Sequence, residues 1–325
     1  MKMKMLEKAF VFVLFLNLIF GCSNIQSQKL KQNEQENVPT KTDVFSPINN
    51  DSVTIPLKPE TATTTTPIVQ GRKEPVLAII LGPGLNRSVA HISLLRVLEQ
   101  KGIKIQMIEG HEMGAIVAAL YARYLSAERV EWFFYKYFRK NDRQEPYSSN
   151  WKKDVEEELL GSFGKDVCRN LTIENLKMDF TLPLFSNKDN KINYWRSGQL
   201  CSMLMVALNP INDKQDQSGA FELSIYNSSA LKKAGADIVI GVDVLGNKIV
   251  FRKEIRRIKD VYEKVLKVKN IEKNYVDYFI SLPTEEMPLD GVENLPLVSK
   301  KSLLYSEKMA GDILEKIKKW KEKNP

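Results

Sequence analysis

One stretch of the chain, Val76 to Ala122, carries a pattern that few folds can accommodate. Its apolar run at 76–81 ends at a Gly-Pro-Gly turn, which is typical of a buried parallel strand followed by a loop. Apolar residues at helical spacing follow and end at Gly102, and residues 103–108 predict a second strand. A sharp turn with a glycine at each end then opens an apolar helix at 115–122. This order of elements predicts an α/β fold with a parallel sheet.

The sharp turn reads Gly110-His111-Glu112-Met113-Gly114, which has the frame of a G-x-S-x-G nucleophile elbow. Glycines flank the central residue of such an elbow because its side chain must stand clear at the top of the sheet. They also let the following helix approach the strand closely. Here the central residue is Glu112, so the frame is present and the nucleophile is missing.

This stretch resembles the opening of a patatin-like phospholipase domain. That family pairs a Gly-rich loop, G-G-G-x-R-G, with a G-x-S-x-G elbow that runs into a G-A-hydrophobic helix. The residues that match are Gly84, Arg87, Val89-Ala90-His91, Leu94-Leu95, Gly110, Gly114-Ala115-Ile116 and Leu120-Tyr121-Ala122. The resemblance implies a three-layer α/β/α sandwich with a mostly parallel sheet over residues 73–322. It also implies lipid acyl hydrolysis by a Ser–Asp dyad that contains no histidine.

A second match lies further along the chain, where Ala234-Gly235-Ala236-Asp237 precedes an apolar run. This resembles the family's Gly-Ala-Asp segment and the strand that follows it. Counting back from Asp237, with one inserted residue, places the family's dyad aspartate at Ser218, in Ser-Gly-Ala. Asp216 would take that role instead if the loop were two residues longer.

The oxyanion loop is also altered, because the family's three glycines fall on Pro83, Gly84 and Leu85. Pro83 has no N–H to donate, and Leu85 is expected not to adopt glycine-like backbone angles cheaply. Losing one oxyanion donor lowers the rate of acyl transfer by roughly 10²–10³. Arg87 matches the family's arginine and is expected to brace the loop or an anion.

Changes at the nucleophile, the base and the oxyanion loop together lead to the hypothesis of a catalytically inactive domain with a lipid-binding or scaffolding role. Glu112 then stabilises the turn, since a negative side chain is favoured at a helix N-terminus. The alternative is an active lipid acyl hydrolase that uses rearranged residues, such as Glu112 with Asp216. In a related alternative Glu112 is a general base whose partner is His111, Arg87 or Ser218.

The N-terminus predicts export and lipidation. Lysines at 2, 4 and 8 precede an apolar run, and residues 1–21 are interpreted as a signal peptide. The junction Ile19-Phe20-Gly21-Cys22 resembles a bacterial lipobox, which implies diacylation of Cys22 and cleavage just before it. Ser23 next to it implies sorting to the outer membrane, facing the periplasm. Residues 22–72 are polar, with a Thr-rich run at 61–67, and predict a flexible tether.

Composition restricts the partners. Two histidines and no C-x-x-C predict no metal site, and no cofactor is expected. The net charge of +8 suits anionic lipid headgroups, so a lipid or membrane surface is the expected partner, with an envelope protein as a second one. Nucleic acid is not expected, because a tethered envelope protein rarely meets it.

Three further expectations concern packing. The basic residues between Lys248 and Lys269 are expected to be solvated outer faces of helices. Cys168 and Cys201 form either a disulfide or two buried thiols. The aromatic residues of a predicted helix at 126–140 either cover the core, which is favoured, or line a lipid-facing surface.

Overall fold

The computed structural model describes residues 74–138, 157, 161–168, 170–211, 214–252, 256–291 and 295–325. All of them fall within one compact unit that runs from Pro56 to Pro325. The predicted signal peptide, Cys22 and the whole of the predicted tether lie outside the described residues. Within the described part of the chain, no helix combines the length and the apolar character needed to cross a bilayer.

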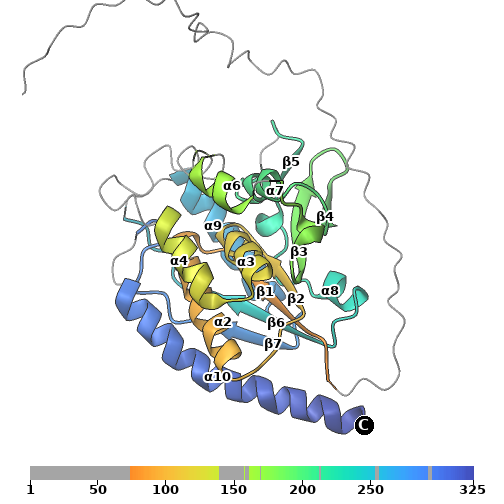
Figure 1. The fold of residues 1–325 in the computed structure, drawn as a ribbon. Coiled ribbons are helices and arrows are strands. Elements are labelled where there is room, and N and C mark those ends of the chain that lie inside the picture. The colour runs from red at the N-terminus through yellow and green to blue at the C-terminus, as the bar shows by residue number, and fades with distance from the viewer. Residues whose placement is uncertain are drawn as a thin grey trace, which may run out of the picture. The chain divides into compact units, whose positions relative to one another are not determined.

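The core of the fold is a seven-stranded sheet with the order β4-β3-β2-β1-β6-β7, to which β5 is added on β3 (Figure 1). The parallel strands are β1 (Leu77–Leu81), β2 (Met107–Gly110), β3 (Asp179–Ser186), β6 (Ile238–Asp243) and β7 (Tyr278–Ser281). Strands β4 (Lys191–Trp195) and β5 (Gln217–Gly219) are antiparallel to β3. The mostly parallel sheet expected from the sequence is confirmed.

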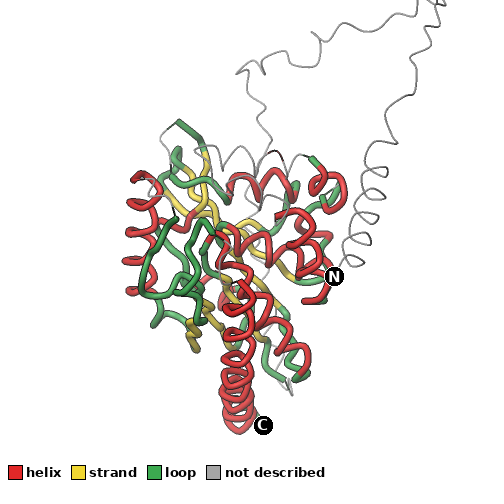
Figure 2. The backbone as a smooth tube through the Cα atoms, turned by 90° about the vertical axis from the view of Figure 1, so that its left-hand side faces the viewer, coloured by secondary structure: helices red, strands yellow, loops and turns green. Residues whose placement is uncertain are grey.

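Helices cover both faces of this sheet, and the strands run between them in both views (Figure 1, Figure 2). Side chains at alternate strand positions point to opposite faces, so Ile79 and Leu81 belong to one core and Ile80 to the other. The first core lies under α2 (Ala90–Gln100), α3 (Met113–Tyr124), α4 (Ala127–Phe138) and α10 (Leu295–Lys323). The second lies under α8 (Ser229–Lys233) and α9 (Arg256–Glu272). The three-layer α/β/α architecture follows.

The remaining elements are short. They are α6 (Ser162–Val167), α7 (Leu200–Ala207) and the 3₁₀ turns η1 (Leu85–Val89), η2 (Ile173–Asn175) and η3 (Ala220–Glu222). The second strand was predicted at 103–108, which is wrong in position, because β2 begins only at Met107. Ile103 and Ile105 are buried in the first core, so their apolar character reflects packing of the connection that leads into β2.

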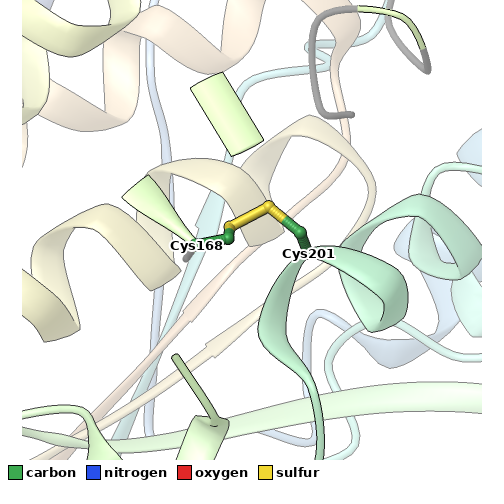
Figure 3. The surroundings of a disulfide bond; sticks show 2 residues. All are labelled: Cys168 and Cys201. Atoms are coloured by element: carbon green, nitrogen blue, oxygen red, sulfur yellow. A yellow bond between two sulfur atoms is a disulfide. The ribbon is translucent and has the colours of Figure 1, made fainter. Parts of the chain in front are cut away.

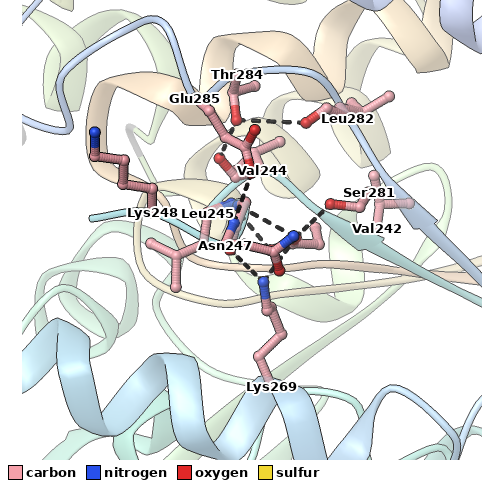
Figure 4. Close-up of polar contacts among 12 residues, drawn as sticks. Val242, Val244, Leu245, Asn247, Lys248, Lys269, Ser281, Leu282, Thr284 and Glu285 are labelled. Atoms are coloured by element: carbon pink, nitrogen blue, oxygen red, sulfur yellow. Dashed lines mark hydrogen bonds and ion pairs between the residues drawn. The ribbon is translucent and has the colours of Figure 1, made fainter. Parts of the chain in front are cut away.

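Lys269 of α9 contradicts the expectation of a solvated basic face. Its side chain is almost fully buried, and its Nζ lies 3.2 Å from Oδ2 of the equally buried Asp243. Figure 4 shows this cluster, in which Lys269 also donates to the Gly246 carbonyl, and Ser281 Oγ donates to Asp243 at 2.7 Å. A carboxylate at the buried end of β6 requires a cation nearby, and α9 supplies it.

A disulfide joins Cys168, just after α6, to Cys201 in the first turn of α7 (Figure 3). The two Cα atoms lie 5.6 Å apart and the residues are 33 apart in sequence. Of the two alternatives that the sequence leaves open, the structure has the disulfide. Helix α7 leads to Asn209, whose carbonyl accepts a hydrogen bond from the Gly219 N–H at 2.8 Å. The disulfide therefore anchors a helix that supports the end of β5.

Candidate active site

The elbow lies where β1 and β2 end together. The two strands are parallel and their last residues, Leu81 and Gly110, are register partners. A Cβ on Gly114 would lie 2.6 Å from the Gly82 carbonyl oxygen, and one on Gly110 would lie 2.5 Å from the Ala115 Cα. Only glycine fits at either position. The structure thus places the G-x-x-x-G frame in a strand, a tight turn and the first turn of α3.

Glu112 occupies the apex of this turn with a backbone that L-residues seldom adopt, at φ 52° and ψ −126°. Such a conformation costs of the order of 1–3 kcal/mol and persists only where the surroundings hold it. Its side chain is 1% exposed, so the apex is closed to solvent. The backbone of an elbow is therefore present around a glutamate in place of the serine.

The carboxylate of Glu112 turns back onto the Gly-rich loop. One oxygen, Oε2, accepts hydrogen bonds from the Gly84 N–H at 3.0 Å and from the Leu85 N–H at 2.9 Å. Two backbone N–H groups that converge on one oxygen form the arrangement that stabilises an oxyanion during acyl transfer. Glu112 Oε2 therefore occupies the position that such a pair of donors offers to a substrate oxygen.

Leu85 corrects the expectation that this residue would avoid glycine-like angles, since its φ is 46°. Its side chain is 2% exposed and packs in the second core with Tyr262 and Leu289. The next residue is fixed as well, because the Asn86 N–H donates to the Leu289 carbonyl at 3.1 Å. Burial and these bonds offset the backbone strain, so the loop keeps two donors even though Pro83 supplies none.

The electrostatics of Glu112 oppose its charged form. Burial raises the pKa of the Glu112 carboxyl above its usual range. The Met113, Gly84 and Leu85 N–H groups and the Tyr262 side chain lower this pKa, but their effect does not outweigh the burial. The Gly84 and Leu85 N–H groups thus favour negative charge on this carboxyl, while its burial away from water opposes that charge more strongly.

Ser218, which is predicted to take the position of the family's aspartate, lies near the elbow because of the sheet topology. Strand β4 pairs with one edge of β3. Strand β5 therefore pairs with the other edge of β3, the edge that also pairs with β2. Glu109 of β2 pairs with Thr181 and Gly219 of β5 pairs with Leu184, which puts β5 just beyond the carboxyl end of β2. Ser218 is fully buried there.

Asp216 does not share this environment. It is exposed in the turn before β5, where its carbonyl accepts a hydrogen bond from the Asn187 N–H at 3.0 Å. Glu112 and Ser218 are both inaccessible to solvent, whereas Asp216 is exposed. The hypothesis that Asp216 replaces the dyad aspartate therefore does not fit this placement.

Arg87 is fully buried and braces two loops. It donates to the carbonyls of Met287 at 2.6 Å and Lys248 at 3.1 Å, and also to that of Leu245. Burial lowers the pKa of its guanidinium to about 10, and nearby Glu285 and Asp243 act in the opposite direction. Of the two roles expected for Arg87, it performs the structural one, since carbonyl oxygens surround the guanidinium.

Both histidines are structural. His91 Nε2 donates to the Gly82 carbonyl at 2.9 Å, and burial lowers the pKa of its ring to about 4. His111 Nε2 lies 3.1 Å from Oε1 of Glu109, whose own pKa burial raises. Because the His111 ring pairs with Glu109 within the sheet, it is not the partner of Glu112. No group of three or more His, Cys, Asp or Glu side chains in the described ranges is arranged to hold a metal ion.

Sequence reasoning missed Tyr262 and Glu109. Tyr262 comes from α9, and no signal close to it in sequence links it to the elbow. Glu109 could have been found, because a charged residue in the apolar strand before His111 needs a buried partner.

Comparison with known proteins finds relatives that share part of the chain. Lysophospholipase nte1 of Neurospora crassa is 23% identical over 181 residues, which cover 52% of this chain and 12% of the relative. Lysophospholipase NTE1 of Mycosarcoma maydis is 42% identical over 57 residues, 18% of this chain and 3% of the relative. Human patatin-like phospholipase domain-containing protein 6 is 36% identical over 55 residues, 17% of this chain and 4% of the relative.

In these three proteins the matched part is 12% or less of the relative's own length. No protein-family model matches the chain. Among solved structures, VipD from Legionella pneumophila has a TM-score of 0.45 and 11% identity over 76% of this chain and 67% of VipD. ExoU of Pseudomonas aeruginosa, in complex with SpcU, has a TM-score of 0.35 and 14% identity over 75% of this chain and 53% of ExoU.

Proposed function

Because its relatives support a patatin-like phospholipase family for this chain, we propose that the protein is a catalytically inactive member whose oxyanion site is filled by its own Glu112. The observation that carries this proposal is the pair of hydrogen bonds from the Gly84 and Leu85 N–H groups to Glu112 Oε2. A substrate carbonyl oxygen would need the same two donors. It would have to displace a covalently tethered carboxylate to reach them.

The other requirements of acyl transfer are also missing. A carboxylate is a poor nucleophile toward an ester, and Ser218 cannot accept a proton as the family's aspartate does. Glu112 is 1% exposed and Ser218 is fully buried, so neither position meets a substrate without rearrangement. Each defect alone would slow acyl transfer severely, and the three act on the same step.

The non-catalytic role is proposed to be lipid binding or scaffolding at the bacterial envelope. Acylation of Cys22 would hold the domain at the outer membrane, on the periplasmic side, through the tether of residues 22–72. The disulfide between Cys168 and Cys201 supports an exported location, since structural disulfides persist mainly in oxidising compartments.

The test is hydrolysis by the full-length protein in detergent micelles, with a fluorogenic ester and a phospholipid as substrates. The expected turnover equals that of Glu112→Gln and of a matched variant, Glu109→Gln, which alters a buried carboxyl outside the oxyanion site. Turnover that disappears in Glu112→Gln but survives in Glu109→Gln would establish an active hydrolase. An acyl-enzyme trapped on any side chain of the elbow would do the same.

A further inference from the structure

The end of α3 and the exposed side of α4 together carry a row of aromatic rings. Tyr124 stacks on Phe133 with ring centroids 4.8 Å apart, and Trp132 meets Phe133 edge-on at 4.8 Å. The core-covering role favoured from the sequence holds for Phe134 and Tyr137, which are buried, but not for Trp132, which is 55% exposed. Leu125, just before α4, is 46% exposed. Trp132 is grouped with the partly buried rings of Tyr124 and Phe133, and a grouped apolar patch of this kind marks an interaction site.

Basic side chains lie over the same rings in cation–π contacts. The guanidinium carbons of Arg123 and Arg129 lie 5.1 and 5.7 Å from the Tyr124 ring centroid. The ammonium of Lys136 lies 4.9 Å from the Trp132 ring centroid and also forms an ion pair with Asp166 at 2.9 Å. We call this combination the α4 surface, defined by Arg123, Tyr124, Leu125, Arg129, Trp132, Phe133 and Lys136.

We propose that the α4 surface docks the domain on the headgroup layer of an anionic phospholipid bilayer. Tryptophan and tyrosine rings favour that layer because one part of each ring system is apolar and another is polar. The cations beside the rings would meet lipid phosphates, which gives the surface its charge complementarity.

This inference rests on the proposed membrane anchoring, which supplies the bilayer. A flexible tether of the length of residues 22–72 has a root-mean-square reach of about 40 Å, so an anchored domain would sample the bilayer continually. Anchoring alone leaves the orientation of the domain free. Docking through the α4 surface would fix it, with Trp132 facing the lipid.

The test uses the full acylated chain reconstituted in vesicles that contain acyl-chain-brominated lipid, which quenches tryptophan only on contact. Vesicles of phosphatidylethanolamine with phosphatidylglycerol are compared with vesicles of phosphatidylcholine. The expected result is a quenched fluorescence component in the anionic vesicles that is absent in Trp132→Phe. Replacing Arg123 or Arg129 by Gln should weaken docking about fivefold per charge. The matched control, Lys318→Gln, alters a lysine of α10 whose side chain is 77% exposed and should change nothing.

Equal quenching in the parent chain and in Trp132→Phe, or no quenching in anionic vesicles, would overturn the inference. The inference would also fail if the change in Trp132 fluorescence depended on the number of protein molecules per vesicle and not on lipid charge, since a second copy would then be the partner. The mass of the Cys22 adduct and the ester turnover, measured on the same sample, report separately on anchoring and on inactivity. Quenching of Trp132 in a chain found to be unacylated would support docking while contradicting the anchor.

Discussion

Replacing Glu112 with alanine gives the sharpest test of the filled oxyanion site. Glu112→Ala keeps the turn but removes the acceptor that the Gly84 and Leu85 N–H groups share. Each buried N–H left unpaired costs about 1–3 kcal/mol, so the loss of stability approaches 2–6 kcal/mol. Removing a carboxyl whose pKa is raised by burial offsets part of this loss, which places the expected value at the low end of that range.

A small carboxylate should then rescue the variant. Formate can take the vacated place of Glu112 Oε2, between the same two donors. A ligand at one hundred times its Kd stabilises a protein by about 2.7 kcal/mol. For a domain of this size that corresponds to a rise in Tm of roughly 5–10 °C. Formate should leave the Tm of the parent chain unchanged, because its own carboxylate already fills the site.

The assay is thermal unfolding of the parent chain, Glu112→Ala and Glu112→Gln in sodium formate and in sodium chloride at equal ionic strength. Glu112→Gln is the matched control, since its amide oxygen can still accept both hydrogen bonds. If formate raised the Tm of all three proteins equally, or of none, the two N–H groups would not form a carboxylate site. The reasoning on Glu112 would then be refuted.

Three further predictions concern other groups. The folded-state pKa of Glu112 is raised, so its stabilising contribution is complete below the unfolded-state value of 4.5 and is lost as pH rises through the folded-state pKa. Glu112→Gln lacks this titrating group. Its free energy of unfolding, measured by denaturant titration between pH 4 and 8, should therefore increase relative to that of the parent chain as pH rises. Glu112→Ser with Ser218→Asp should gain ester hydrolysis that Glu112→Ala with Ser218→Asp lacks, because the serine frees both oxyanion donors while the elbow backbone remains. Lys269→Met should lower the free energy of unfolding by about 3–5 kcal/mol, since Asp243 stays buried without its cation. Adding Asp243→Asn should recover much of that loss, because the unpaired charge is then removed. No recovery in the double variant would argue against the ion pair.

The elements around the elbow could be predicted from the sequence because local chemistry determines them. Gly110 and Gly114 bracket a turn in which a Cβ would collide with backbone, and the apolar runs on either side are buried strands or helices. Ser218 was assigned to the aspartate position through the specific match at Asp237, and that assignment stays a prediction. Short-range spacing carries this kind of information well.

The parts that could not be predicted depend on residues distant in sequence. Leu85 takes a positive φ because the second core buries its side chain, and its own sequence neighbours give no sign of this. Lys269 shares the helical spacing of the buried Tyr262 and Val265, but its charge favours solvent, and the reason for its burial becomes evident only when Asp243 is placed beside it. Tyr262, which lowers the pKa of Glu112, comes from α9, a helix that lies between β6 and β7 in the sequence.

The retained elbow frame is no sign of retained catalysis. Gly114 is required because its Cβ would meet the carbonyl oxygens of Gly82 and Leu81, whatever residue stands at the apex. The strained apex likewise persists as long as something satisfies the facing N–H groups. In a serine enzyme water or substrate does this, whereas here the longer side chain of Glu112 reaches back and does it permanently. Packing alone therefore accounts for the motif in the inactive protein proposed here, and the carboxylate that stands in place of the nucleophile also completes the turn.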